Sequence, residues 1–418
     1  MLKRKVFMKI LLLTANYYPD IAANVHLAKD LAEDLAYYGC IVEIVTKMPD
    51  KKCLDNKFNY NYCGLEETID NKIKIYRVKS IGNKSKSIFL RIIQESILTI
   101  KLLLKSFLIK DIDIIFAYST PPTLGLIGIL LSKIKNIPIV YNLQDIFPDS
   151  LINSGLIKKG IIIKLGKYIE KIIYNNCDKI VVISKQFKEI LKTRGVEEEK
   201  IEVVYNWIDS QKIKDIPQKN NYLFDRYKLD RNNFYLLYSG NLGLTQNIEL
   251  LIDVAKDLEC YSDIRFLIVG DGVNKNKLID YASKKGVQNI IFLPYQSHEE
   301  ISYVYSLGDV GIIISKKNIS KNSLPSKAWS IMAANRAVLA SFDLDSELCE
   351  IIKSHNCGLC VDAENKNELI KAILELYNNK VQLREMSNNG RVFVTNYLDR
   401  KRATTKLYKL FKELIKKN

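Results

Sequence analysis

Short apolar runs alternate along the chain with longer segments whose apolar residues recur every three or four positions. In the first half this pattern predicts strands at 9–14, 41–46, 112–118, 138–142, 179–184 and 201–205, and helices at 26–38, 122–134, 161–175 and 186–193. In the second half it predicts strands at 235–238, 265–269, 290–293, 310–315 and 337–340, and helices at 247–258, 275–285, 298–306, 326–334 and 368–378. Such alternation predicts parallel sheets covered by helices.

A polar stretch at 209–221 separates the two series and has the composition of a linker. A length of 418 residues exceeds what one ordinary core accommodates, so two α/β units in tandem are expected. In open parallel sheets, ligands bind beyond the carboxyl ends of the strands. We therefore expect the chemistry among the residues that follow the strands, in a cleft between the two units.

The net charge of +16 is concentrated in two segments. Residues 71–110 carry ten basic residues against Glu95, residues 400–418 carry eight against Glu413, and the remainder holds 45 residues of each sign. A general lysine bias would spread charge evenly, so the clustering predicts a basic surface patch. Neither segment has a nucleic-acid-binding signature, so the expected partner is an anionic membrane surface and not nucleic acid.

The most apolar segment, 88–109, is interrupted by Arg91, Glu95, Lys101 and Lys105 and does not predict a transmembrane span. Its polar residues fall broadly along one side of a helix. Two interpretations stay open: a basic amphipathic helix that lies on anionic lipid, and a core-packing helix with a lysine-rich solvated face. The first would give a membrane patch formed by Lys84, Lys86, Arg91, Lys101 and Lys105.

Neither a metal site nor a secretory signal is expected. The eight cysteines lack paired spacing apart from Cys357 and Cys360, which favours small buried thiols over zinc ligands. Asp343 and Asp345 mimic a metal-binding pair but lie away from the other candidates. The apolar run at 10–13 is too short for a signal peptide, so we expect a first strand and a cytoplasmic protein.

Three segments of the second half suit a diphosphate. Two are glycine turns after strands, Gly240-Asn241-Leu242-Gly243 and Gly270-Asp271-Gly272, where the backbone can approach an anion. The third runs from Ser323 to Lys327; Ser323 or Ser326 can cap the next helix, and Lys327 supplies a cation. The candidates for donor binding are Gly240, Asn241, Gly243, Gly270, Gly272, Tyr295, Ser323, Leu324, Pro325, Ser326 and Lys327.

Taken in order, the motifs resemble the retaining glycosyltransferase family 4 over nearly the whole chain. The resemblance is strongest to the bacterial branch that acts in O-antigen and capsule assembly, such as fucosamine transferases. The segments that carry it are Tyr17-Tyr18-Pro19-Asp20, Gln144-Asp145-Ile146-Phe147-Pro148-Asp149-Ser150, Val203-Val204-Tyr205-Asn206-Trp207-Ile208-Asp209, Ser239-Gly240-Asn241-Leu242-Gly243, Val269-Gly270-Asp271-Gly272 and Leu324-Pro325-Ser326-Lys327.

The resemblance implies an α/β protein of the GT-B fold, in which two doubly wound Rossmann-like domains face each other across a cleft and the C-terminal helix returns to the N-terminal domain. Residues 1–208 with 397–418 would bind the acceptor, and residues 209–396 the donor. The implied activity is retaining, metal-independent hexosyl transfer from a nucleotide-diphosphate sugar to a polyprenyl-diphosphate-linked glycan. It would take place at the inner face of the plasma membrane and without a cofactor.

The chain departs from the family pattern at several charged positions. The family's Gly-Gly loop is Ala22-Ala23 here, and its histidine position holds Gln144. Its donor-binding Arg and Lys correspond to Asn241 and Gln246, and its paired glutamates to Asn322 and Ser330. The loss of the acidic pair suggests a deoxy or N-acetylated donor sugar.

The candidate catalytic residues are Lys327, which would neutralise the leaving diphosphate, and Asp145, which would position the acceptor. A loop or helix cap is the alternative role of Asp145. His26 begins a helix beside the Ala22-Ala23 loop and could reach the cleft, although a histidine there more often serves packing. The acceptor-side candidates are Ala23, Asn24, His26, Gln144 and Asp145.

Two other functions stay open. The missing Arg, Lys and Glu residues suggest a non-catalytic partner in a glycan-assembly complex. A nucleotide-sugar epimerase can share the same two-domain fold. It would need acid and base carboxylates in the cleft, and a basic amphipathic helix would serve no purpose in it.

Overall fold

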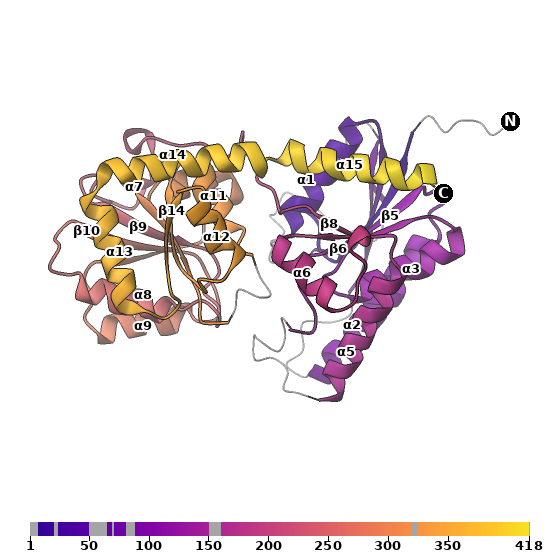
Figure 1. Ribbon diagram of the computed structural model, residues 1–418, viewed down its shortest axis with the longest axis horizontal. Coiled ribbons are helices and arrows are strands. Elements are labelled where there is room, and N and C mark those ends of the chain that lie inside the picture. Colours follow the sequence, from indigo (N-terminus) through magenta and orange to yellow (C-terminus); the bar gives the residue numbers. More distant parts are fainter. Residues whose placement is uncertain are drawn as a thin grey trace. The chain divides into compact units, whose positions relative to one another are not determined.

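The computed structural model describes residues 7–20, 24–49, 65–68, 71–80, 88–149, 160–318 and 324–417 (Figure 1). The chain forms two compact units. Unit 1 comprises Met1–Ile152, Ile157–Tyr205 and Lys401–Asn418, and unit 2 comprises Asn153–Leu156 and Asn206–Arg400. Each unit is built on its own predominantly parallel sheet, which confirms the predicted α/β fold of two Rossmann-like domains.

Unit 1 has an eight-stranded sheet in the order β3-β4-β2-β1-β5-β6-β7-β8. Only β3 runs antiparallel, to β4 at the edge. Residues of β5 and β6 are buried on both faces of the sheet, as expected for parallel strands between helical layers. The strands are β1 (Lys9–Leu13), β2 (Ile41–Lys47), β3 (Leu65–Thr68), β4 (Ile73–Val78), β5 (Ile114–Tyr118), β6 (Ile139–Leu143), β7 (Lys179–Val182) and β8 (Ile201–Val203).

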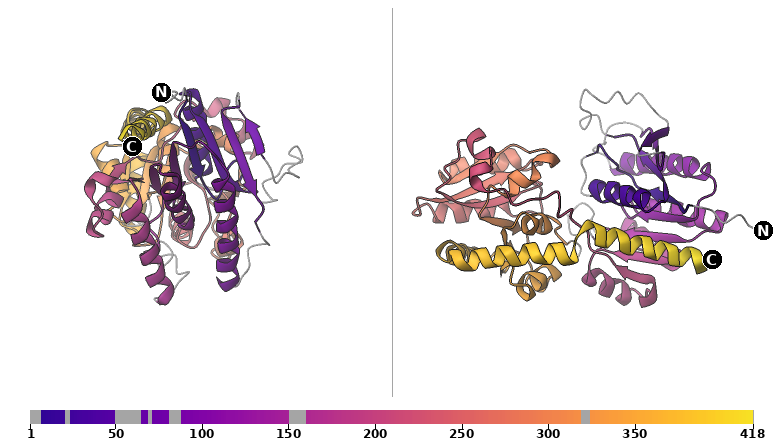
Figure 2. Two further views of the ribbon diagram at one scale, coloured as in Figure 1. Left: turned by 90° about the vertical axis from the view of Figure 1, so that its right-hand side faces the viewer. Right: turned by 90° about the horizontal axis from the view of Figure 1, so that it is seen from above.

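The helices of unit 1 form a layer on each face of this sheet (Figures 1 and 2). On β5, Phe116 contacts Phe411 of the C-terminal helix, whereas Ile115 and Ala117 point towards Gly128 of α3. Because neighbouring strand residues face opposite sides, α15 and α3 cover opposite faces. The helices are α1 (Val25–Tyr37), α2 (Ile88–Phe107), α3 (Thr123–Lys135), α5 (Ile161–Asn176), α6 (Lys185–Thr193) and α15 (Arg400–Lys417).

The C-terminal helix α15 belongs to unit 1, as predicted from the family resemblance. Thr404 donates a hydrogen bond to Asp34 at 2.8 Å, and the Tyr38 hydroxyl lies 2.8 Å from that of Thr405. Tyr408 packs on the Tyr38 ring, with centroids 5.0 Å apart. The first half of α15 is therefore attached to α1 and to the residue that follows it.

Unit 2 has a parallel sheet in the order β11-β10-β9-β12-β13-β14. The chain builds the sheet outward from β9 in one direction, then returns to β12 on its other side, so the topological switch point lies between β9 and β12. The strands are β9 (Phe234–Ser239), β10 (Ile264–Val269), β11 (Ile290–Leu293), β12 (Val310–Ile314), β13 (Ala337–Ser341) and β14 (Gly358–Val361).

The helices of unit 2 are α7 (Leu223–Arg226), α8 (Ile248–Asp257), α9 (Lys275–Lys284), α10 (Ile301–Tyr305), α11 (Lys327–Ala333), α12 (Glu347–Ser354), α13 (Lys366–Asn378) and α14 (Lys380–Tyr397). Of these, α8, α9, α13 and α14 contribute buried residues to a core centred on β9, β10 and β12.

Predicted elements agree with the structure to within two residues at each end, with one exception. The predicted helix at 298–306 divides into a short 3-10 turn, His298–Glu300, and α10. The predicted linker was wrong as well, because residues 209–221 belong to unit 2. There Ile213 is buried, and the backbone N–H groups of Lys214 and Ile216 donate to hydroxyls of the α10 region.

Candidate functional site

The glycine turns that follow β9 and β10 lie directly against each other. Gly240 N donates to Val269 O at 2.9 Å, and Leu242 N to Asp271 O at 2.8 Å. A Cβ on Gly270 would stand 1.9 Å from the Gly240 carbonyl oxygen, and one on Gly272 would stand 2.5 Å from the Leu242 carbonyl. These two glycines are therefore required by the packing of one turn on the other, which sets the position of the first turn.

Gly240 serves a different purpose, because it makes room for Lys327. A Cβ there would lie 2.8 Å from the Lys327 amine. That amine donates to the Tyr238 hydroxyl at 3.2 Å and stands 4.4 Å from the centre of the Tyr238 ring. Tyr238 is fully buried and donates in turn to Asn241 O at 2.7 Å. The structure thus brings two of the predicted donor motifs together at the carboxyl end of β9, beside the switch point.

Lys327 is a cation without a counter-ion among the described residues. Its side chain is half-buried, and no carboxylate of the described chain forms an ion pair with it. Desolvation lowers the pKa of Lys327 to about 8. A diphosphate at this point would supply the missing negative charge and would favour the protonated amine.

This lowered pKa predicts the pH dependence of donor use. The charged amine is the form that binds a diphosphate, and in the free protein it is lost as the pH rises through about 8. We therefore expect kcat/KM to depend on the protonation of the Lys327 amine from about pH 8 upward. Above that pH, kcat/KM should fall about tenfold per pH unit. A pH profile with subsaturating donor measures this. In a Lys327→Arg variant, the guanidinium stays charged, so that alkaline limb should disappear.

A buried polar cluster below Lys327 was not predicted. Tyr305 of α10 is buried, and burial raises the pKa of its hydroxyl, while Ser330 of α11 and Ser239 at the end of β9 oppose that shift. Ser330 is the position where the resemblance places a glutamate, so this part of the site carries no negative charge at that position. An apolar helix pattern gave no signal that Tyr305 points inward at this place.

Other predicted donor residues of unit 2 lie in the loops that follow β9 and β11. Gly243 N donates to the Gln246 side chain at 3.2 Å, so Gln246 stabilises its own turn. Asn241 and Tyr295 are exposed, Tyr295 two residues beyond the end of β11. Their donor-binding roles stay predictions.

The segment before α11 differs from its predicted geometry. Leu324 and Pro325 are half-buried, and Ser326 occupies the N-cap position of α11. Ser326 has helical backbone angles and its side chain makes no capping hydrogen bond, so the predicted cap by Ser326 was wrong. Ser323 lies outside the described residues.

In unit 1, the loops after β5 and β6 are joined by hydrogen bonds. Gln144 N donates to the Ser119 hydroxyl at 2.9 Å, and the Gln144 side chain donates to Asn142. Asn24, just before α1, donates to the Thr120 hydroxyl at 3.4 Å. The predicted acceptor-side residues Asn24 and Gln144 are thus both tied to the loop after β5.

Asp145 follows Gln144 and is exposed, with no hydrogen bond or ion pair among the described residues. Desolvation raises the pKa of Asp145, although water moderates this effect because the side chain is exposed. His26 lies half-buried in the first turn of α1, at the same carboxyl edge of the sheet. Ala23 falls outside the described residues. The acceptor-side role of this group stays a prediction.

A partly buried ion cluster holds the loop that carries Asp145. Arg194, after α6, forms ion pairs with Asp149 of this loop and with Glu170 of α5. Glu170 also accepts a hydrogen bond from Tyr174. Gly166 of α5 leaves space for the loop, because a Cβ there would stand 2.7 Å from Phe147. Asp149 therefore has a structural role, whereas the Asp145 carboxylate remains available.

We predict that Arg194→Met lowers the free energy of unfolding by about 2 to 3 kcal/mol, since it leaves the buried Glu170 without a cation. Burial already raises the pKa of Glu170 to about 7, and Arg194 opposes that shift. Without Arg194 the pKa rises further, so the loss should grow as the pH rises through 7 and the carboxylate ionises. Denaturant unfolding at pH 6 and pH 8 measures this. The double variant Glu170→Gln/Arg194→Met should recover most of the loss; no recovery would contradict the proposed ion pair.

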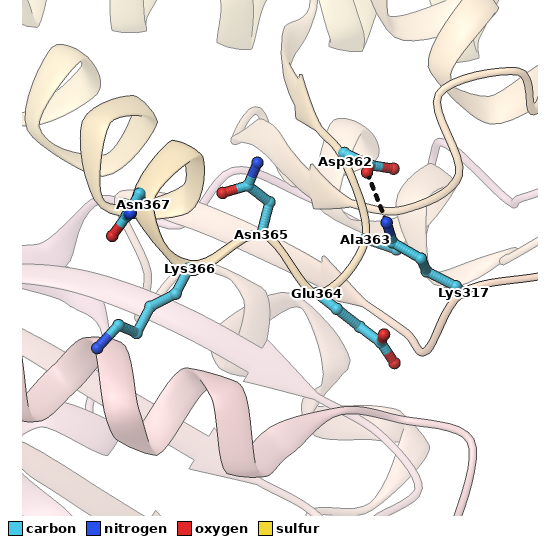
Figure 3. Close-up of a pocket in the computed structure, with 7 residues that line it drawn as sticks. All are labelled: Lys317, Asp362, Ala363, Glu364, Asn365, Lys366 and Asn367. Carbon is cyan, nitrogen blue, oxygen red and sulfur yellow. Dashed lines mark hydrogen bonds and ion pairs between the residues drawn. The ribbon is translucent and has the colours of Figure 1, made fainter.

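A separate hollow lies at the carboxyl end of β14 (Figure 3). Its volume is about 350 Å³, and an ion pair of 2.9 Å between Lys317 and Asp362 borders it. The other lining residues belong to the turn that enters α13 and to its first two residues. Lys317 and Asp362 neutralise each other, and Lys366 pairs with Asp257 at 2.8 Å, so the hollow offers a diphosphate no unpaired cation of the kind found at Lys327. Within the described ranges, no group of three or more His, Cys, Asp or Glu residues is placed to hold a metal ion.

Both halves of the chain match known protein families. Residues 25–212 match the family described as Glycosyltransferase Family 4, and residues 221–393 match Glycosyl transferases group 1. Among curated proteins, the putative colanic acid biosynthesis glycosyl transferase WcaI of Escherichia coli (strain K12) is 24% identical over 382 residues, covering 88% of this chain and 91% of WcaI. These matches support the family and leave the finer resemblance to fucosamine transferases a prediction.

Solved glycosyltransferase structures share the fold. Sucrose-phosphate synthase from Thermosynechococcus elongatus superposes with a TM-score of 0.79 at 16% identity, over 98% of this chain and 100% of that one. Anabaena HepE in complex with UDP-glucose superposes with a TM-score of 0.73 at 16% identity, over 97% and 100%. With a Glycosyltransferase Family 4 domain followed by a Glycosyl transferases group 1 domain, the chain belongs to the glycosyltransferases.

Proposed function

We propose that this glycosyltransferase moves a sugar from a nucleotide-diphosphate donor to a lipid-linked glycan acceptor during synthesis of a surface polysaccharide such as O-antigen or capsule. The observation that carries the proposal is Lys327, a cation with no described counter-ion at the switch point of the unit 2 sheet. Two similarities support it: HepE binds UDP-glucose, and WcaI is named for colanic acid biosynthesis. In this proposal, unit 2 binds the donor and unit 1 the acceptor, at the inner face of the plasma membrane.

The proposed reaction retains the anomeric configuration and uses no metal. The bond between the anomeric carbon and the diphosphate oxygen breaks, and the acceptor hydroxyl oxygen bonds to that carbon from the same side. The acceptor's proton passes to the departing diphosphate. Lys327 stabilises the negative charge that develops on this leaving group. Asp145, whose carboxylate has no described partner, positions the acceptor hydroxyl.

We propose that the donor sugar is deoxy or N-acetylated. The two positions at which the resemblance places glutamates hold Asn322 and Ser330. A carboxylate can accept hydrogen bonds from two sugar hydroxyls, whereas asparagine and serine carry no charge. A sugar with fewer hydroxyls suits such a site. UDP-glucose as the best donor would contradict this part of the proposal.

The test is a donor screen with the full chain. UDP-, GDP- and dTDP-sugars are incubated in EDTA with a short polyprenyl-diphosphate-linked sugar, and the product is identified by mass and by the configuration of the new linkage. A product with retained configuration supports the proposal. An inverted product, or one that requires added metal, would contradict the mechanism. Folded protein that neither binds nor turns over any donor would overturn the proposal in favour of a non-catalytic partner.

A further inference from the structure

The helix layer formed by α2, α3 and α5 has an unusual outer face. On α2, Leu98 and Leu102 are buried towards the sheet. The opposite side carries an apolar stripe at spacings of four, three, four and three residues, formed by Ile93, Ile97, Ile100, Leu104 and Phe107. Leu104 is 62% exposed. The sequence left open a core-packing helix with a lysine-rich outer side; the structure shows that the outer side is apolar.

The neighbouring helices extend this surface. The hydroxyls of Thr99 on α2 and Thr123 on α3 lie 3.0 Å apart, and Lys135 at the end of α3 donates to the Phe107 carbonyl at 3.1 Å. On the far side of α3, Gly125 packs against Ile173 of α5. All three helices lie on the same face of the sheet (Figures 1 and 2). Their exposed apolar side chains beyond α2 are Leu130, Ile134, Leu165 and Tyr168.

This outer face, which we name the α2–α3–α5 face, is basic along α3 and α5. The three helices contain eight basic residues and two acidic ones, although Lys101 and Lys105 of α2 are directed away from the outer side. One of the two acids, Glu170, is buried and paired with Arg194. Lys133, Lys164 and Lys167 are exposed and have no ion-pair partner among the described residues. Exposed apolar side chains between unpaired lysines match the chemistry of a bilayer with anionic headgroups.

We propose that the α2–α3–α5 face is the surface by which the protein lies on an anionic bilayer. The proposal rests on the proposed function in one respect, because a lipid-linked acceptor must be reached at that bilayer. Both α2 and α5 begin at the carboxyl edge of the unit 1 sheet (Figure 1). Gln144 and Asp145 lie at the same edge, because they directly follow β6. Docking through this face would hold the acceptor-side loops near the membrane surface.

The charge of the face favours lipid over a second copy of the chain. A symmetric dimer would bring the same patch of each subunit together, and the basic residues of one would oppose those of the other. An anionic bilayer pairs with them instead, and the exposed leucine and isoleucine side chains enter the headgroup boundary. Among the described residues, no helix combines the length and hydropathy needed to cross a bilayer.

This placement changes the predicted membrane patch. The amine of Lys101 donates to the Lys79 carbonyl at 3.0 Å, and that of Lys105 lies over the Tyr76 ring. Lys84, Lys86 and the Arg91 side chain fall outside the described residues. The basic helix α15 covers the opposite face of the sheet, as its contact with Phe116 shows. The two basic segments predicted from the sequence therefore do not share one surface.

Vesicle co-sedimentation of the full chain tests the proposal. Vesicles of phosphatidylcholine alone are compared with vesicles that contain an equal part of phosphatidylglycerol. We expect at least tenfold tighter binding to the anionic vesicles, because the unpaired lysines of the face attract anionic headgroups. Ile100→Ser/Leu104→Ser and Lys164→Ala/Lys167→Ala should each weaken that binding at least tenfold.

Two matched controls should bind like the unaltered chain. Val381→Ser/Val392→Ser removes exposed apolar side chains from α14 of unit 2, and Lys409→Ala/Lys416→Ala removes exposed lysines from α15. Equal binding by the face variants and the unaltered chain would overturn the proposal. So would a dimer, seen by sedimentation equilibrium, that dissociates in Ile100→Ser/Leu104→Ser, because the face would then join two copies.

The outcome is separable from the proposed function. Titration with nucleotide-diphosphate donors in the absence of vesicles should be unchanged in the face variants. Donor binding without vesicle binding would remove the membrane face and leave the transferase. Vesicle binding without donor binding would leave the membrane face and remove the proposed transferase function.

Discussion

Lys327→Met should lower kcat/KM by about 10² to 10³-fold, the range observed when one preorganised electrostatic donor is removed from a transition state. Methionine preserves the length of the side chain and its contact with the Tyr238 ring, over which the amine stands at 4.4 Å. What it removes is the charge that faces the departing diphosphate. Because that charge develops as the glycosidic bond breaks, kcat should fall more than donor affinity.

Steady-state kinetics with the donor identified by the screen measures this effect. Calorimetric titration of the corresponding nucleoside diphosphate shows how much of the loss in kcat/KM comes from weaker binding. Lys256→Met is the matched control: it removes an exposed unit 2 lysine that pairs with Glu259, and should change kcat/KM less than twofold. Thermal unfolding should show that Lys327→Met is no less stable, since an amine without a described counter-ion has been replaced by an apolar group. Unchanged kcat/KM in Lys327→Met would show that another group neutralises the diphosphate.

The fold was predictable because the pattern of apolar residues along the chain indicates where its buried strands and helices lie. Strands such as Ile114–Tyr118 and Val310–Ile314 are buried along their entire length, and a continuous apolar run bounded by polar residues predicts that. Elements without such runs were missed. In β4, which lies next to the edge strand β3, Lys74 and Arg77 interrupt the apolar residues, and α14 is a largely polar helix that ends unit 2.

The candidate site was predictable only in its separate parts. Gly240 and Lys327 lie in two recognisable motifs, yet they are 87 positions apart in the chain, and no local pattern encodes that the glycine makes room for the lysine amine. The same limit applies to Ser330 and Tyr305, and to Arg194, which joins the loop at Asp149 to α5. Such pairings depend on how strands are ordered in the sheet, and strand order is a property of the whole unit.

Helix amphipathicity was misjudged on α2 for a related reason. Counting charged positions places lysines along one side, and a lysine-rich side is expected to face water. The structure instead directs Lys101 and Lys105 to the Lys79 carbonyl and the Tyr76 ring, because their long side chains reach past the helix to neighbouring groups. The outer surface is thereby left to isoleucine and leucine, which is the basis of the proposed membrane face.

Gly270→Ala should destabilise unit 2 by about 3 kcal/mol or more and abolish donor binding with it. The added Cβ would stand 1.9 Å from the Gly240 carbonyl oxygen, and this neighbour is backbone, so no side-chain rotation can relieve the overlap. The φ angle of +157° adds conformational strain for alanine. The two turns must separate, and Gly240 then moves away from the Lys327 amine.

Denaturant unfolding, followed by donor titration of the folded fraction, measures both effects. Gly286→Ala is the matched control in the same unit: its φ is also positive, at +63°, but the nearest atom to the new Cβ is the end of the Lys256 side chain at 4.0 Å. It should cost only about 1 kcal/mol, from backbone strain alone, and leave donor binding intact. If Gly270→Ala were no more costly than Gly286→Ala, the close packing of the two glycine turns would not be what positions Gly240 against Lys327.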